Sequence, residues 1–283
     1  MGTELMQAGL EPGGCGEYWN LSEPEKILNI QRRYAEAGAD CLITNTFGAS
    51  RLMLARHGRA DEVRAINQAG VRIARNAFDG RQGYVLGDMG PLGGILEPYG
   101  EIRIADAAEA YREQALALVE AGADAIIIET QTSLEELGLA IDAARQARAP
   151  SIIASLAYDL SADKEFFVTM MGVLPEKAAA FVQEKGAHVV ALNCGTGMDM
   201  GAADRVVRSY RKHSNLGIMV QPNAGLPVLE GGKAVYKESP ENMASRVAGV
   251  LSAGANIVGS CCGSTPAHTR AIRLAVDQFG RNR

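Results

Sequence analysis

The chain has 283 residues, of which 47% are hydrophobic and 22% charged, and its formal net charge is -5. Lysines and arginines form no conspicuous run, which argues against a nucleic-acid-binding protein. No apolar run approaches the roughly 18 residues of a membrane-spanning helix, and the N-terminus lacks the pattern of a signal peptide. The five cysteines are too few for a disulfide scaffold, so we expect a protein of the reducing cytoplasm.

Four stretches of the chain share one pattern. Each ends a predicted helix at a glycine, the usual residue for the left-handed position after a helix. Each then continues into an apolar run and ends in polar residues. The stretches are 36–47, 120–131, 184–195 and 252–263. They lie about twice the roughly 30 residues of a βα unit apart, so they represent every second unit of a longer series.

Three further strands are predicted between these stretches, and helical patterns alternate with them. The strands are nearly continuous in apolar residues, as expected for parallel strands that are covered on both faces. They fall at 83–90, 150–158 and 216–225, and the clearest helices at 22–37, 106–122, 133–147 and 239–254. This alternation predicts an α/β fold with a parallel sheet.

The chain length suits a (β/α)₈ TIM barrel, which typically has about 250 residues; a doubly wound sheet is the alternative. Seven strands are predicted where a closed barrel has eight. The helix at 22–37 has no strand before it. The expected fold is therefore a single barrel domain over residues 1–283 whose first strand is missing from the chain.

Polar residues gather where the predicted strands end, the face at which such barrels carry their chemistry. They include three of the five cysteines, from two different strands. The residues are Thr44, Asn45, Thr46, Asp88, Glu129, Thr130, Asn193, Cys194, Gln221, Asn223, Cys261 and Cys262.

Three thiolates from separate strand ends suit a tetrahedral Zn²⁺. Neighbours in a regular strand point to opposite faces, so Cys261 and Cys262 can share one metal only where the strand has ended and the backbone turns. Three protein ligands leave the fourth position open, which is the catalytic pattern and suits a thiol substrate. The alternative is that Cys261 and Cys262 are inert buried thiols. We expect this inert role for Cys41, which lies in mid-strand. Cys15 is expected to face solvent.

Several motifs resemble those of the homocysteine S-methyltransferase family, in the family's order and along essentially the whole chain. They are NCG (193–195), PNAG (222–225), GSCCGSTPAH (259–268), ADCLITNTFGAS (39–50), GDMGPLG (87–93) and ETQTS (129–133). The resemblance implies a zinc-bearing barrel that methylates homocysteine to methionine. It places the metal on Cys194, Cys261 and Cys262.

Further roles follow from the resemblance by position. Glu129 would receive the homocysteine ammonium, and Thr44 would lie near its carboxylate. Asn223 would sit close to the zinc and take the fourth position in the absence of substrate. A structural ion pair for Glu129 and an Asx-turn for Asn223 are the alternatives. Asp88 and Asn45 match family motifs without an assigned step.

Branches of this family differ in the methyl donor that they use. The betaine-using branch carries an aromatic residue where this chain has Gly48, and a quaternary ammonium needs aromatic faces. The stretches 87–101 and 221–236 instead resemble the homocysteine domain of cobalamin-dependent methionine synthase. This implies methylcobalamin as donor, carried by a separate corrinoid protein. S-methylmethionine is the alternative donor.

The family usually opens with a strand ending in a DGAMGT-like turn whose aspartate faces the substrate amine. This chain begins MGTEL. Three explanations could account for the missing strand: a start codon assigned too late, a shortened chain, or a natural loss of the strand. We favour the first. Without that aspartate, half of the ammonium site would be gone.

Three rival functions remain. One is an inactive barrel that only binds zinc or a partner, and another is a methyltransferase for a different thiol or selenol. A Schiff-base barrel enzyme would need a lysine at a strand end, whereas Lys164 and Lys233 fall in predicted loops.

Overall fold

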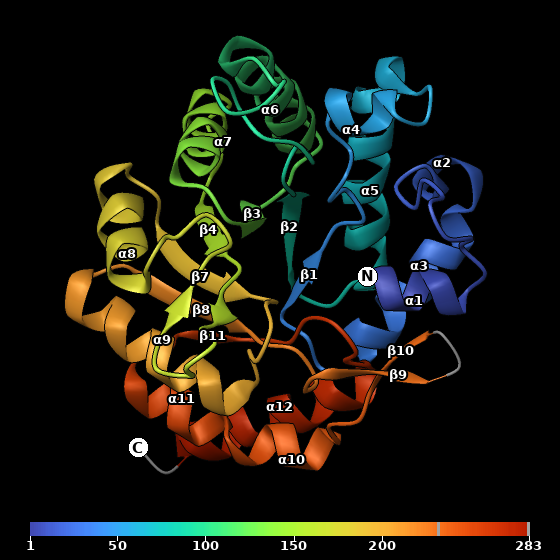
Figure 1. Cartoon of the computed structure of the whole chain (residues 1–283). Coiled ribbons are helices and arrows are strands. Elements are labelled where there is room, and N and C mark those ends of the chain that lie inside the picture. Colours follow the sequence, from blue (N-terminus) through green and yellow to red (C-terminus); the bar gives the residue numbers. More distant parts are fainter. Residues whose placement is uncertain (231–232, 282–283) are drawn as a thin grey trace. The chain divides into compact units, whose positions relative to one another are not determined.

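The computed structural model describes residues 1–230 and 233–281 (Figure 1). The chain divides into two compact units. The first comprises Met1–Glu36, Asp40–Gln131 and Glu135–Ile153; the second comprises Ala37–Ala39, Thr132–Leu134 and Ala154–Arg283. The boundary falls inside strand β4 (Ile152–Leu156), so each unit has its own run of parallel strands.

The first unit contains the strand order β1-β2-β3 followed by the start of β4. Strand β1 pairs in parallel with β2, and β2 with β3. The interior of β3 is a run of buried apolar side chains, as expected for a strand that is covered on both faces. The strands are β1 (Cys41–Ile43), β2 (Tyr84–Met89) and β3 (Ala125–Gln131).

The helices of the first unit follow the amphipathic patterns in the sequence. They are α1 (Gly2–Gln7), α2 (Trp19–Ser22), α3 (Pro24–Glu36), α4 (Arg51–Ala55), the 3₁₀ helix η1 (Ala60–Glu62), α5 (Val63–Ala77), α6 (Ile104–Glu120) and α7 (Leu134–Gln146). Ser50 caps α4 by accepting a hydrogen bond from the Met53 N–H.

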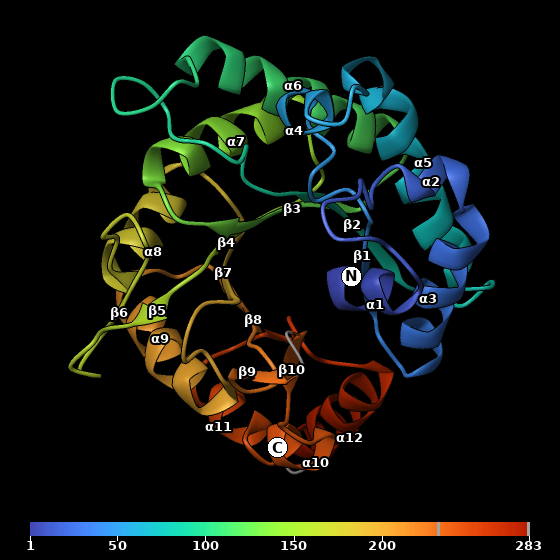
Figure 2. The ribbon, with the colours of Figure 1, turned by 45° about the vertical axis from the view of Figure 1, so that its right-hand side comes forward.

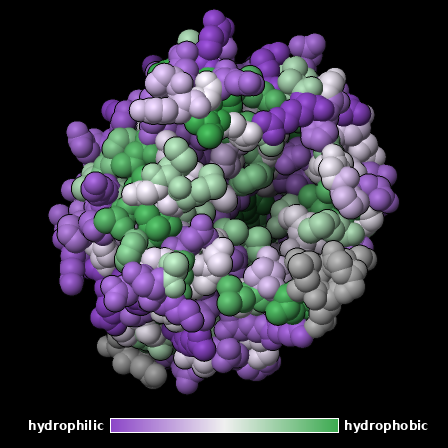
Figure 3. Space-filling view, in the orientation of Figure 1, coloured by the Kyte–Doolittle hydropathy of each residue, from purple (hydrophilic) through white to green (hydrophobic). Residues whose placement is uncertain are grey.

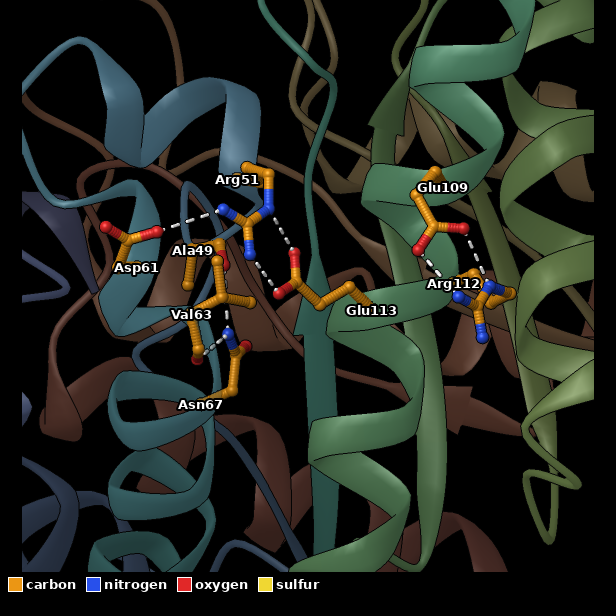
Figure 4. Close-up of polar contacts among 8 residues, drawn as sticks. All are labelled: Ala49, Arg51, Asp61, Val63, Asn67, Glu109, Arg112 and Glu113. Carbon is orange, nitrogen blue, oxygen red and sulfur yellow. Dashed lines mark hydrogen bonds and ion pairs between the residues drawn. The ribbon is translucent and has the colours of Figure 1, made fainter.

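Charged side chains tie α4 to α6 on the surface of this unit (Figure 4). Arg51 contacts Glu113 through two hydrogen bonds of 2.9 and 2.6 Å, and it also reaches Asp61 at 3.3 Å. Below them, the buried Asn67 amide donates to two backbone carbonyls, which fixes the start of α5. Because Arg51 and Glu113 pair with each other, we interpret the shallow hollow between α4 and α6 as part of the packing of these two helices.

The second unit continues the parallel pairing in the order β4-β7-β8-β11. Asn193 at the end of β7 lies opposite Gln221 at the end of β8, and Val258 of β11 lies opposite Val220 of β8. These three strands therefore end close together. They are β7 (Val189–Asn193), β8 (Gly217–Gln221) and β11 (Ile257–Val258).

Within residues 154–230 and 233–281, two antiparallel strand pairs and five helices complete the second unit (Figures 1 and 2). The hairpins pair β5 with β6 and β9 with β10; the sequence patterns did not predict them. Their strands are β5 (Asp159–Leu160), β6 (Phe167–Val168), β9 (Pro227–Glu230) and β10 (Lys233–Tyr236). The helices are α8 (Pro175–Glu184), α9 (Met200–His213), α10 (Pro240–Ser245), α11 (Val247–Ala253) and α12 (Pro266–Arg281).

One predicted helix is interrupted in the structure. The pattern at 239–254 indicates a single helix, but the structure has α10 and α11, which are separated at Arg246. The guanidinium of Arg246 lies 3.1 Å from the Asp199 carboxylate at the start of α9. This contact is between residues far apart in the sequence, so helical periodicity could not reveal it.

The other main features of the predicted fold are confirmed. Seven parallel strands form the main sheet, and within residues 1–230 and 233–281 no strand precedes β1. The four repeat glycines after the helices all have positive φ, as predicted: Gly38, Gly122, Gly186 and Gly254. Among the described helices, none is long and apolar enough to cross a membrane. The face drawn in Figure 3 is largely hydrophilic, with hydrophobic residues in small groups.

Candidate metal centre

Three cysteines of the second unit converge at the ends of β7 and β11. The Cys262 sulfur lies 3.9 Å from the Cys194 sulfur and 3.9 Å from the Cys261 sulfur, and all three atoms lie within 4.8 Å of one another. A tetrahedral zinc with Zn–S bonds of about 2.3 Å separates its sulfurs by roughly 3.8 Å. The spacing therefore fits three ligands of one metal ion, and the structure brings together the three cysteines that the sequence singled out.

Cys194 is held by a strained turn at the end of β7. Its own φ is 57° and that of Gly195 is 92°, a region that side chains other than glycine rarely adopt. Before the turn, the buried Asn193 accepts a hydrogen bond of 2.6 Å from the Ser155 hydroxyl. A Cβ at Gly195 would lie 1.9 Å from the carbonyl oxygen of Tyr158. The NCG sequence is thus required by the backbone path that presents the Cys194 sulfur.

Cys261 and Cys262 lie in a turn just beyond the end of β11. The Cys261 N–H donates to the Pro222 carbonyl at 2.8 Å, and the Cys262 carbonyl accepts from the Ala224 N–H at 2.9 Å. The Ser264 hydroxyl closes the turn by donating to the Cys261 carbonyl at 2.7 Å. Because the strand has ended, adjacent residues can direct their sulfurs to one point, as the sequence predicted.

Asn223 joins the two cysteine loops. Its side-chain amide donates to the Gly195 carbonyl at 3.0 Å, and its side-chain oxygen accepts from the Cys262 N–H at 3.2 Å. The residue is 5% exposed. Asn223 therefore clamps both ligand loops together, which is neither a simple Asx-turn nor evidence of metal ligation; its role as a fourth ligand stays a prediction.

The sulfur cluster favours a thiolate. Hydrogen bonds with Cys194 and Cys261 lower the pKa of Cys262 to about 3, against the opposing effect of burial. For Cys194, the hydrogen bond with Cys261 lowers the pKa, but the hydrogen bond with Cys262 and burial outweigh it, and its pKa is raised. Burial raises the pKa of Cys41 to about 11. Of the cysteines with a shifted pKa, Cys262 is therefore the one prepared to offer a thiolate to a cation.

The predicted substrate-binding residues Thr44 and Glu129 lie in the first unit, at the ends of β1 and β3. The buried Thr44 hydroxyl lies 2.6 Å from the Thr46 hydroxyl and accepts from the Asp88 N–H at 2.9 Å. Glu129 is half-buried and hydrogen-bonds with the Asp88 carboxyl. The alternative role predicted for Glu129 was a structural ion pair. Its contact with Asp88 is not an ion pair, because both residues are acids.

Asp88 is the residue at this site whose contacts sequence reasoning missed. Its side chain is 3% exposed and its Oδ1 atom has no hydrogen-bond partner among the described residues. Burial and the nearby Glu129 carboxylate raise its pKa well above the usual value. The sequence signals were its position near the end of a buried strand and its place in a family motif, and neither reveals its partner.

The raised pKa of Asp88 predicts a pH-dependent stability. The folded protein holds this proton where the unfolded chain has lost it, so the stabilisation is full below pH 3.8 and is lost as the pH rises through the folded pKa. Asp88→Asn keeps a hydrogen-bond donor for Glu129 without titrating. We expect its unfolding temperature, relative to wild type, to rise between pH 4.5 and pH 8 by about 2 °C or more. A constant difference across this range, as expected for the exposed control Asp79→Asn, would contradict the assignment.

Comparison with known proteins decides the family. The profile described as homocysteine S-methyltransferase matches residues 1–276. The chain belongs to the homocysteine S-methyltransferase family. It is 38% identical over 298 aligned positions to a methionine synthase of Mycobacterium tuberculosis and 36% identical over 290 to one of Mycobacterium leprae. These alignments cover 99% and 98% of the chain but 24% of each relative, so the chain spans about a quarter of their length.

Solved structures support the same fold. The metallated form of the homocysteine methyltransferase MmuM from Escherichia coli matches with a TM-score of 0.77 and 21% sequence identity, covering 97% of this chain and 93% of that one. At this identity the likeness concerns the fold alone. Together with the seven parallel strands, it confirms the predicted TIM-barrel class, and the family match confirms the resemblance seen in the motifs.

The turn at Gly195 provides a test of how the family's NCG motif builds the cluster. Gly195→Ala is expected to destabilise the protein by about 1–3 kcal/mol beyond the cost of a left-handed alanine, because its Cβ meets the Tyr158 carbonyl. It should also weaken zinc binding, since Cys194 must move. Gly172→Ala is the matched control, with φ at 81° but no atom within 4 Å of the added Cβ. Urea unfolding and zinc titration of both variants would check this, and equal losses would contradict it.

Proposed function

We propose that the chain, as one homocysteine-binding domain over residues 1–283, transfers a methyl group to the thiol of homocysteine and forms methionine. The observation that carries the proposal is the triad of sulfurs of Cys194, Cys261 and Cys262, spaced as one metal requires. Membership of the homocysteine S-methyltransferase family supports the substrate and the reaction. Thiolate chemistry of this kind fits a reducing cytoplasm.

The three cysteines would hold Zn²⁺, because thiolates are its preferred ligands and three of them leave one position open. When bound, zinc supplies a positive charge that lowers the pKa of the substrate thiol. The chain's own part is to present these sulfurs on loops that Asn223 joins. This rigid arrangement supports a defined position for the incoming sulfur atom.

Glu129 and Thr44 would bind the amino-acid end of the substrate. The half-buried Glu129 carboxylate suits an ammonium group, and the Thr44 hydroxyl suits the substrate carboxylate. In the reaction, the substrate thiol loses its proton to solvent and its sulfur attacks the methyl carbon. A carbon–sulfur bond forms, and the bond from the methyl group to the donor breaks, leaving the electron pair on the donor.

The donor that we propose is methylcobalamin, supplied by a separate corrinoid protein, with cob(I)alamin as the product. The similarity to methionine synthases supports this choice. S-methylmethionine is the second candidate. Two alternative functions would replace the proposal. One is methyl transfer to a different thiol, and the other is a barrel that binds zinc without catalysis.

The test is a direct assay of the zinc-loaded chain with homocysteine and methylcobalamin. Formation of methionine and cob(I)alamin in equal amounts would support the proposal. Turnover with S-methylmethionine alone would move the chain to the other donor, and turnover of cysteine or 2-mercaptoethanol but not homocysteine would change the acceptor. Zinc binding without turnover in any arm would overturn the homocysteine assignment.

A further inference from the structure

An asparagine at the end of β7 donates a hydrogen bond to one sulfur of the cysteine cluster. Nδ2 of the buried Asn193 lies 3.9 Å from the Cys261 sulfur. This distance is long because a neutral thiol is a weak acceptor, whereas a thiolate attracts the same N–H more strongly. Asn193 was predicted to lie at a strand end, but no pattern in the sequence assigned it a role.

A serine on the neighbouring strand fixes the orientation of this amide. The Ser155 hydroxyl, in β4, donates to Oδ1 of Asn193 at 2.6 Å, and both side chains are 0% exposed. A carboxamide carries its acceptor and its donors on separate branches, so the hydroxyl that holds Oδ1 leaves Nδ2 facing Cys261. If the amide were reversed, its oxygen would face the sulfur, and a thiolate would repel it.

The serine, the asparagine and the cysteine connect four strands of the sheet. The strand order is β4-β7-β8-β11, with Ser155 in β4, Asn193 at the end of β7 and Cys261 just beyond β11. The contact between Asn193 and Cys261 therefore spans the end of β8. The backbone of Cys261 is held separately, by the Pro222 carbonyl, whereas the Asn193 amide acts on the sulfur itself.

We propose that Asn193 is a positioning residue that directs the Cys261 sulfur toward the metal, with Ser155 holding its amide in the required orientation. Metal binding requires the thiolate form of Cys261, and the hydrogen bond from the amide then becomes charge-assisted and stronger. It fixes the direction of the sulfur and withdraws electron density from it, as outer contacts of metal ligands do. More of the metal's positive charge is thus left for the substrate thiol. This inference rests on the metal centre proposed above.

The test measures metal binding by the whole chain, without homocysteine or any methyl donor. Ser155→Ala removes the orienting hydroxyl and leaves Asn193 and the cysteines in place. Asn193→Leu removes the donor and keeps a side chain of similar volume. We expect zinc affinity, measured by competition with a chelating dye, to fall several-fold in Ser155→Ala and about 10-fold in Asn193→Leu. In the cobalt-loaded chain, the sulfur-to-cobalt charge-transfer band should move to longer wavelength in both variants, because the sulfur has lost a hydrogen bond.

The double variant shows whether the serine acts through the asparagine. Ser155→Ala combined with Asn193→Leu should bind zinc no more weakly than Asn193→Leu alone, because the orienting hydroxyl has nothing left to orient. Coupling of this kind is what a double-mutant cycle measures. Losses that add in the double variant, or a change in Asn193→Leu but none in Ser155→Ala, would overturn the part assigned to Ser155. If Asn193→Leu does not fold, Ser155→Ala still tests the proposal.

Ser214→Ala is the matched control. Ser214 is a buried serine of the same unit, its hydroxyl donates to the Tyr210 carbonyl at 3.2 Å, and it precedes β8 at the opposite end from the cysteines. It should shift the urea midpoint as Ser155→Ala does, but change neither zinc affinity nor the cobalt band.

The outcomes separate this inference from the proposed function. Unchanged zinc affinity and an unchanged cobalt band in both Ser155→Ala and Asn193→Leu would overturn the inference and leave the homocysteine assignment untouched. Conversely, a chain that binds zinc but does not methylate homocysteine would overturn the proposed function, and the same measurements would still decide the role of Asn193.

Discussion

Cys261→Ala is expected to lower the zinc affinity of the chain about 100-fold and to abolish methyl transfer to homocysteine. Structural zinc sites with four ligands bind with about 10–16 kcal/mol in total, so one thiolate contributes roughly 3 kcal/mol. The loss of activity should be larger than this affinity change, because saturating zinc cannot restore a missing ligand. Cys262 would also lose a neighbour 3.9 Å away that lowers its pKa.

The measurements are zinc content, zinc affinity by chelator competition, and methionine formation. Cys15→Ser is the matched control, because Cys15 is half-buried in the first unit and its sulfur lies 3.8 Å from Glu17. It should retain zinc and activity. Prolonged dialysis of wild type against a chelator should reproduce the Cys261→Ala defect, with recovery on adding zinc. Full activity of Cys261→Ala at wild-type zinc content would refute the three-cysteine centre.

Glu129→Gln should raise the KM for homocysteine and lower kcat/KM by roughly 10- to 100-fold, with zinc affinity unchanged. A hydrogen bond between charged partners contributes about 1.5–3 kcal/mol, and the amide keeps the shape of the carboxylate but not its charge. The neighbouring Asp88 carboxyl, buried and with a raised pKa, cannot readily take over as a second anion. The effect is therefore expected to concentrate on binding of the substrate ammonium.

Steady-state kinetics over a range of homocysteine concentrations would measure this change. Glu135→Gln makes the same substitution on an exposed residue of α7 and should behave as wild type. A second comparison uses 3-mercaptopropionate-type thiols that lack the ammonium group, for which Glu129→Gln should show no additional loss. An unchanged KM for homocysteine would assign Glu129 to the structural role that its contact with Asp88 also allows.

Local patterns were sufficient for most of the elements and for the location of the cysteine cluster. Each repeat glycine that ends a helix is a short-range signal, since a left-handed position favours glycine whatever the tertiary surroundings. The parallel strands read as continuous apolar runs because they are covered on both faces. Once the strands were known, the ends of β7 and β11 had to lie on one edge, which brought Cys194 into the same predicted site as Cys261 and Cys262.

Periodicity could not predict features that depend on contacts between distant residues. The break at Arg246 accompanies an ion pair with Asp199, and both hairpins pair residues whose local pattern resembles a loop. The clamp by Asn223 depends on hydrogen bonds to Gly195 and Cys262. Each of these contacts joins segments that only the folded chain brings together.

The cysteine cluster and the family could be read from the order of residues, because the cysteines and their glycines are specified by residue type and by position at a strand end. The chemical environment of those residues came only from the tertiary structure. Asp88 meets Glu129 across two neighbouring strands, and Asn193 accepts a hydrogen bond from Ser155 of the strand beside it. Burial, pKa and hydrogen bonding depend on what packs around a group in three dimensions, and residue type alone does not contain that information.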